Sequence, residues 1–133
     1  MLDKRKFYIN GRWVEPKKPN DFNVINPCNE DPCAIISLGS KEDTNAAIKS
    51  AKNAFETWKE TTKEDRLNYL EKLLSVYKKR SREMAEAISL EMGAPMDWAT
   101  EVQTASGQSH LEDFILRLKD FEFDEHFNKK SNN

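Results

Sequence analysis

Apolar residues recur about every 3.6 positions through most of the chain beyond residue 40, which is the spacing of one face of an α-helix. Two of these stretches begin with a polar residue three positions before an acid, Ser40 before Asp43 and Thr62 before Asp65. This arrangement is a capping box with Asp in the place of Glu, so both residues are expected to start helices. The apolar positions that follow are Ala47, Ile48, Ala51, Ala54, Phe55 and Trp58 in the first stretch and Leu67, Leu70, Leu74 and Tyr77 in the second.

Two more helices are predicted further along the chain. Ser81 is expected to cap the third helix. Gly93 followed by Pro95 is expected to end it, because glycine adopts the left-handed conformation that closes many helices. The last helix is expected from about residue 95 to about residue 119. Gly107 interrupts it at a cost of about 1 kcal/mol relative to alanine.

Short β-prone runs separated by turn residues occupy the first forty residues. The runs are residues 7–9, 12–14, 22–26 and 33–38. Asn10-Gly11 separates the first two, and this pair favours a two-residue hairpin turn because both positions need a positive φ. All of the strands precede all of the helices, whereas a parallel sheet needs strand–helix–strand crossovers. The chain is therefore predicted to be α+β, with short antiparallel N-terminal strands followed by three to four helices, and it cannot build a dinucleotide-binding sheet alone.

The charge balance and composition exclude several classes of protein. The 133 residues include 21 Lys and Arg against 23 Asp and Glu, and the net charge of -2 does not suit a protein that coats nucleic acid. No run of about 18 apolar residues is present, so we expect no membrane span. No apolar stretch follows the basic N-terminus, as it would in a secretory signal. Cys28 and Cys33 cannot form a disulfide framework, which favours the cytoplasm.

No residues are spaced as a catalytic or metal-binding cluster. Nothing in the spacing brings Cys28 or Cys33 to His110 or His126, so the cysteines are interpreted as a turn residue and a small apolar strand residue. No second Cys or His pair stands at zinc spacing, and the glycines are too scattered for a phosphate-binding loop. The basic cluster at residues 78–82 is interpreted as a solvated helix end, because no aromatic residue interleaves it to stack bases.

Apolar stripes recur on every predicted helix, while only a few short strands are available to cover them. Some apolar surface is therefore expected to remain exposed, which usually marks an interface. Trp13, Trp58 and Trp98 are interpreted as core residues rather than as the lining of a pocket. The chain is thus expected to lie against another protein segment.

Five segments, in this order, resemble the start of an NAD(P)-dependent aldehyde dehydrogenase. They are residues 7–14 (FYINGRWV), 24–27 (VINP), 38–43 (LGSKED), 46–58 (AAIKSAKNAFETW) and 83–95 (EMAEAISLEMGAP). Each segment alone is common, but the ordered set is specific and extends over about residues 7–123. The last four residues of the final segment are most similar to bacterial broad-substrate or semialdehyde-type members.

The resemblance implies a family reaction in which an aldehyde and NAD or NADP yield a carboxylate and the reduced cofactor, through thiolate attack, hydride transfer and thioester hydrolysis. The family's oxyanion-hole, cofactor-loop, general-base and nucleophile motifs do not occur in this sequence. Residues 107–110 imitate the nucleophile motif but carry His110 where cysteine is needed. No catalytic or cofactor-binding residue is therefore assigned. The chain is expected to be a scaffold part of the α/β cofactor-binding domain and not to bind the cofactor alone.

The resemblance also implies a monovalent cation site. Many family members bind such an ion near the end of the second extended run and the end of the helix before Gly-x-Pro. The matching positions are Val24 and Ile25, through their backbone oxygens, and Glu91. The alternative is that Val24 and Ile25 are buried strand residues and that Glu91 is an acid at a helix end. The family's remaining ligand lies beyond this chain.

Two functions remain open from the sequence. In the first, residues 1–123 are the N-terminal part of an aldehyde dehydrogenase cofactor-binding domain, residues 124–133 are a disordered polar tail, and the isolated chain is inactive. In the second, the chain is a non-catalytic helical interaction module that binds the missing part of a split dehydrogenase. Nucleic acid and membranes are not expected as partners. In the family, the substrate aldehyde, the choice of NAD or NADP and the oligomeric state depend on residues past Asn133 or on pocket shape.

Overall fold

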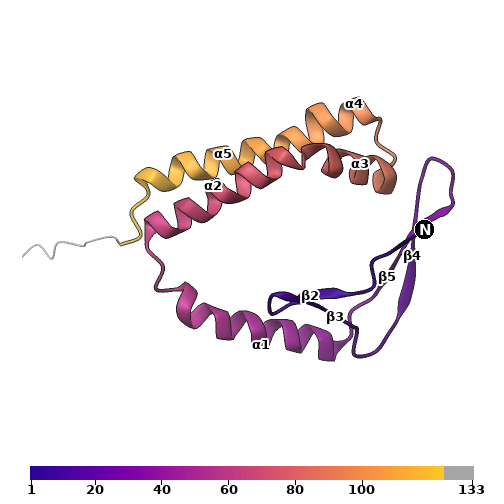
Figure 1. Ribbon diagram of the computed structural model, residues 1–133, viewed down its shortest axis with the longest axis horizontal. Coiled ribbons are helices and arrows are strands. Elements are labelled where there is room, and N and C mark those ends of the chain that lie inside the picture. Colours follow the sequence, from indigo (N-terminus) through magenta and orange to yellow (C-terminus); the bar gives the residue numbers. More distant parts are fainter. Residues whose placement is uncertain (125–133) are drawn as a thin grey trace, which may run out of the picture.

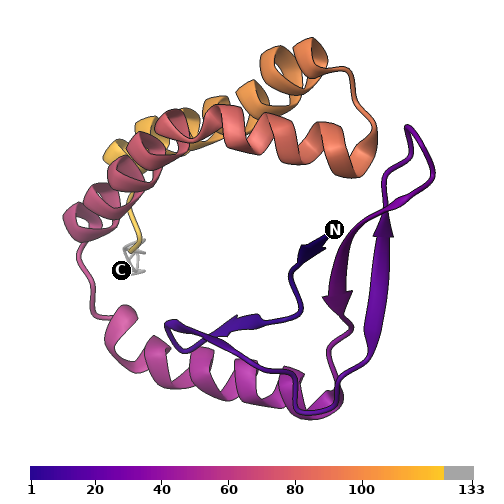
Figure 2. The ribbon, with the colours of Figure 1, turned by 45° about the vertical axis from the view of Figure 1, so that its right-hand side comes forward.

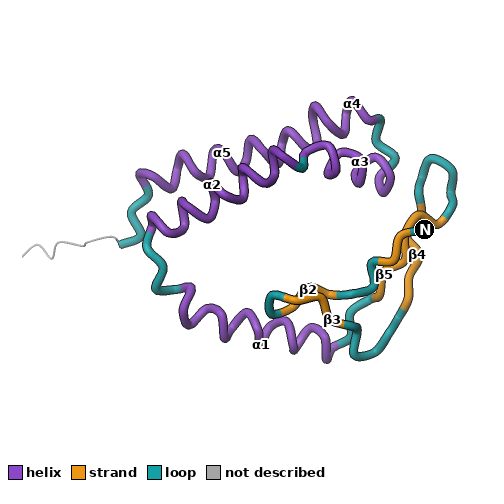
Figure 3. Tube along the Cα trace, viewed as in Figure 1, coloured by secondary structure: helices purple, strands orange, loops and turns teal. Residues whose placement is uncertain are grey.

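The chain is arranged as two arms, an N-terminal arm of strands with one helix and a helical arm (Figure 1). The computed structural model describes residues 1–124. The N-terminal arm contains β1 (Leu2–Asp3), β2 (Phe7–Ile9), β3 (Arg12–Val14), β4 (Asp21–Ile25), β5 (Pro32–Ser37) and α1 (Lys41–Trp58). The helical arm contains α2 (Lys63–Lys79), α3 (Ser81–Met92), α4 (Met96–Trp98), the π-helical segment η1 (Ala99–Thr104) and α5 (Ala105–Asp120). The predicted α+β class is confirmed, with the strands confined to the first arm (Figure 3).

Two small sheets make up the strand part of the N-terminal arm. β2 and β3 form the predicted antiparallel hairpin, and Asn10 and Gly11 have φ angles of 55° and 74°. β4 and β5 are also antiparallel, with Phe22 opposite Ile36. β1, which the sequence did not predict, pairs in parallel with β5, so the strand order is β1-β5-β4.

The predicted helix ends are confirmed except at one position. Ser40 and Thr62 each form a complete capping box, and Gly93 ends α3 with a φ of 72°. The prediction that Ser81 caps a helix is wrong. Arg80 alone separates α2 from α3, and it stands at the N-cap of α3 without a side-chain cap.

Residues 96–120 are helical as predicted, but the helix is not α-helical throughout. It is divided into α4, η1 and α5, and the π-helical segment lies where α3 packs against it. Ala85 of α3 and Ala99 of η1 are completely buried, and the Tyr77 hydroxyl of α2 donates a hydrogen bond to the Thr104 carbonyl at 2.9 Å. A Cβ on Gly107 would lie 3.0 Å from Tyr77 Cζ. Because π-helical turns are rare and occur mostly as single turns inside α-helices, helical periodicity did not predict this one.

Large apolar side chains are mostly exposed. The buried apolar residues among the described ones are Ala85, Ala99 and Ile115. Figure 2 shows the reason: the chain curves, and the β2–β3 hairpin lies on the side of α1 that faces α2. The predicted surplus of apolar surface is thus a property of the fold.

Candidate functional site

The cation-site residues named from the sequence lie at the end of β4 and near the end of α3, and the fold brings these two element ends close together. Val24 and Ile25 end β4, and the register of the β4–β5 pair shifts between them. Glu91 is exposed near the end of α3. The turn after β4 reaches the end of α3, because a Cβ on Gly93 would lie 2.9 Å from Pro27 Cγ.

The local structure agrees with the interpretation as a strand residue at Val24 but not at Ile25, which is 45% exposed rather than buried. The Val24 carbonyl accepts a hydrogen bond from the Cys33 thiol at 3.4 Å, and Val24 is half-buried as a strand residue would be. A ligand role for Val24, Ile25 and Glu91 therefore stays a prediction.

The cysteines do not meet a histidine within residues 1–124. Cys28 is exposed with its Sγ 4.0 Å from the Gly93 carbonyl, and Cys33 is half-buried beside Val24. His110 is exposed on α5, and His126 lies outside the described residues. In the same range, no three His, Cys, Asp or Glu side chains are grouped to hold a metal ion.

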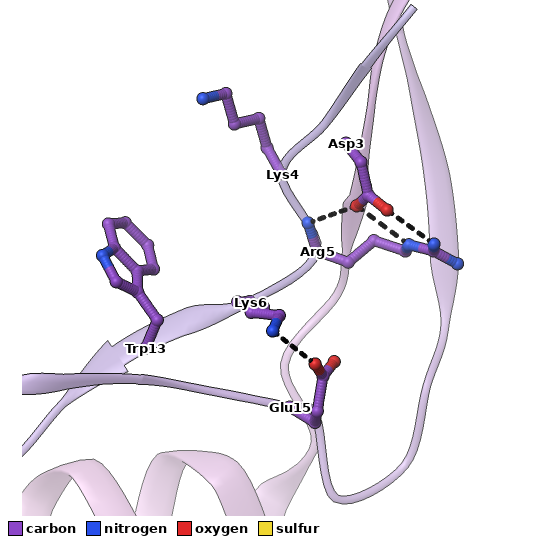
Figure 4. Close-up of a pocket in the computed structure, with 6 residues that line it drawn as sticks. All are labelled: Asp3, Lys4, Arg5, Lys6, Trp13 and Glu15. Carbon is purple, nitrogen blue, oxygen red and sulfur yellow. Dashed lines mark hydrogen bonds and ion pairs between the residues drawn. The ribbon is translucent and has the colours of Figure 1, made fainter.

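A surface hollow of about 600 Å³ lies beside the N-terminus (Figure 4). Its charged side chains form ion pairs, Arg5 with Asp3 at 2.6 Å and Lys6 with Glu15 at 2.8 Å. The hydrogen bonds from Arg5 lower the pKa of Asp3 to about 2, and the bond from Lys6 to Glu15 raises the pKa of the lysine. Sequence reasoning did not find this hollow, because Lys6 and Glu15 meet only once the hairpin has formed.

The starts of α1 and α2 do not suit a dinucleotide phosphate. A pyrophosphate binds where backbone N–H groups at a helix N-terminus point toward it. At α1, the Ser40 side chain accepts the Asp43 N–H, and the Asp43 carboxylate accepts the Ser40 N–H. At α2, Thr62 and Asp65 form the same pair of bonds. Both starts are thus capped by carboxylates, which repel an anion, so neither of these two starts fits the pyrophosphate of NAD or NADP.

No helix within residues 1–124 is long and apolar enough to cross a membrane.

Comparison with known proteins identifies the family. A sequence model of the aldehyde dehydrogenase family matches residues 13–132. The chain belongs to the aldehyde dehydrogenase family. The predicted resemblance to the N-terminal portion of these enzymes is confirmed, and the arrangement of short strands before helices matches that part of their fold.

Relatives in this family are much longer than the chain. It is 39% identical over 126 residues to a 3-succinoylsemialdehyde-pyridine dehydrogenase of a Pseudomonas species. The aligned region covers 94% of the chain and 26% of that enzyme. It is 36% identical over 125 residues to a putative aldehyde dehydrogenase of Staphylococcus saprophyticus, with the same coverage of each. The chain therefore spans about a quarter of the length of the curated relatives that it matches.

Solved aldehyde dehydrogenases contain the same fold. The enzyme of Bartonella henselae is 52% identical with a TM-score of 0.94, over 99% of this chain and 28% of that one. Aldehyde dehydrogenase C of Pseudomonas syringae, a C291A variant in complex with NAD+ and octanal, is 32% identical with a TM-score of 0.90, over 93% of this chain and 26% of that one. The whole curved arrangement of strands and helices thus recurs as one part of larger enzymes.

Proposed function

We propose that this chain is the non-catalytic, N-terminal scaffold part of an NAD(P)-dependent aldehyde dehydrogenase. The reaction is the oxidation of an aldehyde to a carboxylate, in which the bound dinucleotide accepts a hydride. In this proposal, the catalytic thiol, the general base and the dinucleotide contacts are all supplied by the remaining portion of the enzyme.

The exposure of the apolar helix faces carries this proposal. Ile48 and Phe55 of α1 and Phe114 of α5 are each more than half exposed, although a folded domain normally covers such side chains. Exposed apolar surface on helices usually marks an interface when it is extensive. The relatives, being about four times longer, have additional chain that could cover it. A cytoplasmic location is part of the proposal and is supported by the two free cysteines.

The test is a measurement of dehydrogenase activity. The purified chain is mixed with a panel of aldehydes and with NAD or NADP, and the absorbance of the reduced cofactor is recorded. We expect no reduction by the chain alone and measurable reduction once the remaining portion of a dehydrogenase is added. Reduction that rises in proportion to the concentration of the chain alone would overturn the scaffold role.

The second candidate function, a helical interaction module that complements a split dehydrogenase, is favoured by the same exposed faces. The two candidates differ in how the chain unfolds in urea. Coincident transitions by circular dichroism and tryptophan fluorescence would indicate an autonomous module. Helical signal without a cooperative transition would indicate a part that needs the rest of the enzyme.

We also propose a monovalent cation site at Val24, Ile25 and Glu91. The approach of Pro27 to Gly93, which brings the turn after β4 to the end of α3, supports it. The E91Q variant should lose any stabilisation against heat that sodium or potassium chloride gives over choline chloride. Equal stabilisation of the variant and the natural chain would contradict the site.

A further inference from the structure

The inner sides of the two arms carry large apolar residues that nothing within residues 1–124 covers. We use the name inner surface for Tyr8, Trp13, Trp58, Tyr69, Leu73 and Val76. In both ribbon views, the β2–β3 hairpin lies between α1 and α2, so one face of the hairpin is turned toward the helical arm (Figures 1 and 2).

The hairpin presents its aromatic pair on that face. Side chains alternate along a strand, and Phe7, Ile9 and Val14 are half-buried on the face toward α1. Tyr8 and Trp13 are directly opposite each other on the other face, with ring centroids 5.3 Å apart, and they are 62% and 68% exposed. Figure 4 shows Trp13 pointing away from α1.

The α2 helix carries a matching stripe. Tyr69, Leu73 and Val76 follow the i, i+4, i+7 spacing of one helix face, and each is about half exposed. This face differs from the one that packs on α5, where Tyr77 bonds to Thr104. The Trp58 ring, at the end of α1, lies with its centroid 5.4 Å from that of Tyr69. The stripe is therefore turned toward the N-terminal arm.

We infer that the inner surface is the face on which the remaining portion of an aldehyde dehydrogenase docks; this inference rests on the proposed function. The Bartonella henselae enzyme keeps the same curvature over 99% of this chain, although the chain is only 28% of that enzyme. The curvature thus persists in an enzyme of which the matched region is only 28%. A surface that curves inward between two arms fits a convex body and does not fit a second copy of itself.

The size and chemistry of the inner surface suit such an occupant. Each large aromatic side chain buries about 150–250 Å² when fully covered, so covering the exposed parts of six apolar residues removes on the order of 600 Å² from water. This approaches the roughly 800 Å² that each partner contributes to a stable interface. None of the six residues is charged, so the occupant presents apolar side chains.

The experiment measures binding rather than activity. The probe is the Bartonella henselae enzyme shortened by the region that matches this chain, and its affinity for the chain is measured by calorimetry. The segment removed from that enzyme is the positive control, because it must rebind if the shortened enzyme is folded. If that control fails, the same variants are compared by thermal stability in a chimera that carries this chain in place of the matched region.

The variants W13E and L73E each place a charge on the inner surface, one from each arm. Each should weaken binding at least about tenfold, as for a residue at the centre of an interface. The matched control is L116E on α5. Leu116 is 64% exposed, and its neighbours one turn away are the charged residues Glu112, Asp113, Lys119 and Asp120. This variant should bind within twofold of the natural chain, and circular dichroism should show unchanged helix content in all three.

The outcomes separate the inference from the proposed function. Binding by W13E and L73E that equals that of the natural chain overturns the inference, even if the complex reduces NAD. No binding by the natural chain, with the positive control intact, also overturns it. Light scattering could also show a mass of two chains for the natural chain and of one chain for both variants. That result would assign the inner surface to a second copy instead. Binding that depends on the inner surface in a complex without dehydrogenase activity would leave the inference standing and contradict the proposed function.

Discussion

The two arms are held together by different interactions. In the N-terminal arm, the buried residues among those described are Ser37 and Asp43, and both are polar. Their side chains accept hydrogen bonds from the backbone of the loop that precedes β4, Ser37 from Asn20 at 3.0 Å and Asp43 from Lys17 at 2.9 Å. In the helical arm, the buried residues among those described are mostly apolar, namely Ala85, Ala99 and Ile115 beside the polar Thr104.

This difference shows how a chain with a small core can still define its shape. Hydrogen bonds are directional but each stabilises a fold by only about 1 kcal/mol. Close packing is less directional and depends on volume, so a change of one methyl group in it is felt. The N-terminal arm should therefore respond to changes in protonation, and the helical arm should respond to changes in side-chain size.

The largest effect is expected from removing apolar volume in the helical arm. The I115A variant should lower the free energy of unfolding by about 2–4 kcal/mol, because Ile115 is only 8% exposed and a cavity would remain. Urea unfolding followed by circular dichroism measures this. The control is L116A at the adjacent exposed position, which should change stability by less than about 0.5 kcal/mol. Equal effects of the two variants would mean that the helical arm has no packed core.

A smaller effect is expected from adding a methyl group to the helical arm. A Cβ at residue 107 would lie 3.0 Å from Tyr77 Cζ and still closer to its hydroxyl, which bonds to Thr104. The G107A variant should therefore lose about 1–2 kcal/mol of stability by overpacking, although alanine favours a helix by about 1 kcal/mol over glycine.

The control for G107A is the same substitution in the N-terminal arm. At Gly39 an added Cβ would meet only Phe7 Cζ, at 3.8 Å, so G39A should be neutral or slightly stabilising. Both variants are compared by the midpoint of urea unfolding. If G107A instead stabilised the chain, the packing between α2 and α5 would accommodate an added methyl group. The helical arm would then not be more sensitive to side-chain size than the N-terminal arm.

The features that the sequence predicted are those that depend on neighbouring residues. The capping boxes at Ser40 and Thr62, the Asn10-Gly11 turn and the end of α3 each follow from residues within a few positions of one another. From the sequence, Gly107 was interpreted only as a residue that lowers the stability of the last helix. Its role depends on Tyr77, thirty positions earlier, whose side chain fills the space that a Cβ would take.

Non-local contacts also limited what could be predicted about the candidate site. The approach of Pro27 to Gly93 joins two segments more than sixty residues apart, and no periodicity reports such a contact. Val24, Ile25 and Glu91 were brought together by resemblance to a family, not by their spacing. The sequence also did not predict the parallel pairing of β1 with β5, because a strand of two residues is too short to show an alternating pattern.

The smallest effect is expected from pH, which should weaken the contact between α1 and the loop before β4. Asp43 and Asp65 occupy the same place in two capping boxes, and hydrogen bonds lower the pKa of both. For Asp43 the Lys17 N–H is the main cause, followed by Ser40, whereas for Asp65 the bonds come from Thr62 alone. A carboxyl whose pKa is lower in the folded state stabilises the fold above its unfolded pKa, and this contribution is lost as the pH falls through the folded value. Acidification below about pH 4 should therefore release the loop from α1 while α2 loses only its local cap.

Amide hydrogen exchange measures the release of this loop. At neutral pH, the D43N variant should speed exchange at the Lys17 amide, whereas D65N should leave it unchanged. If D65N speeds exchange at Lys17 as much as D43N does, the bond from Lys17 to Asp43 does not hold the loop, and the N-terminal arm is stabilised by something other than the polar contacts that distinguish it here.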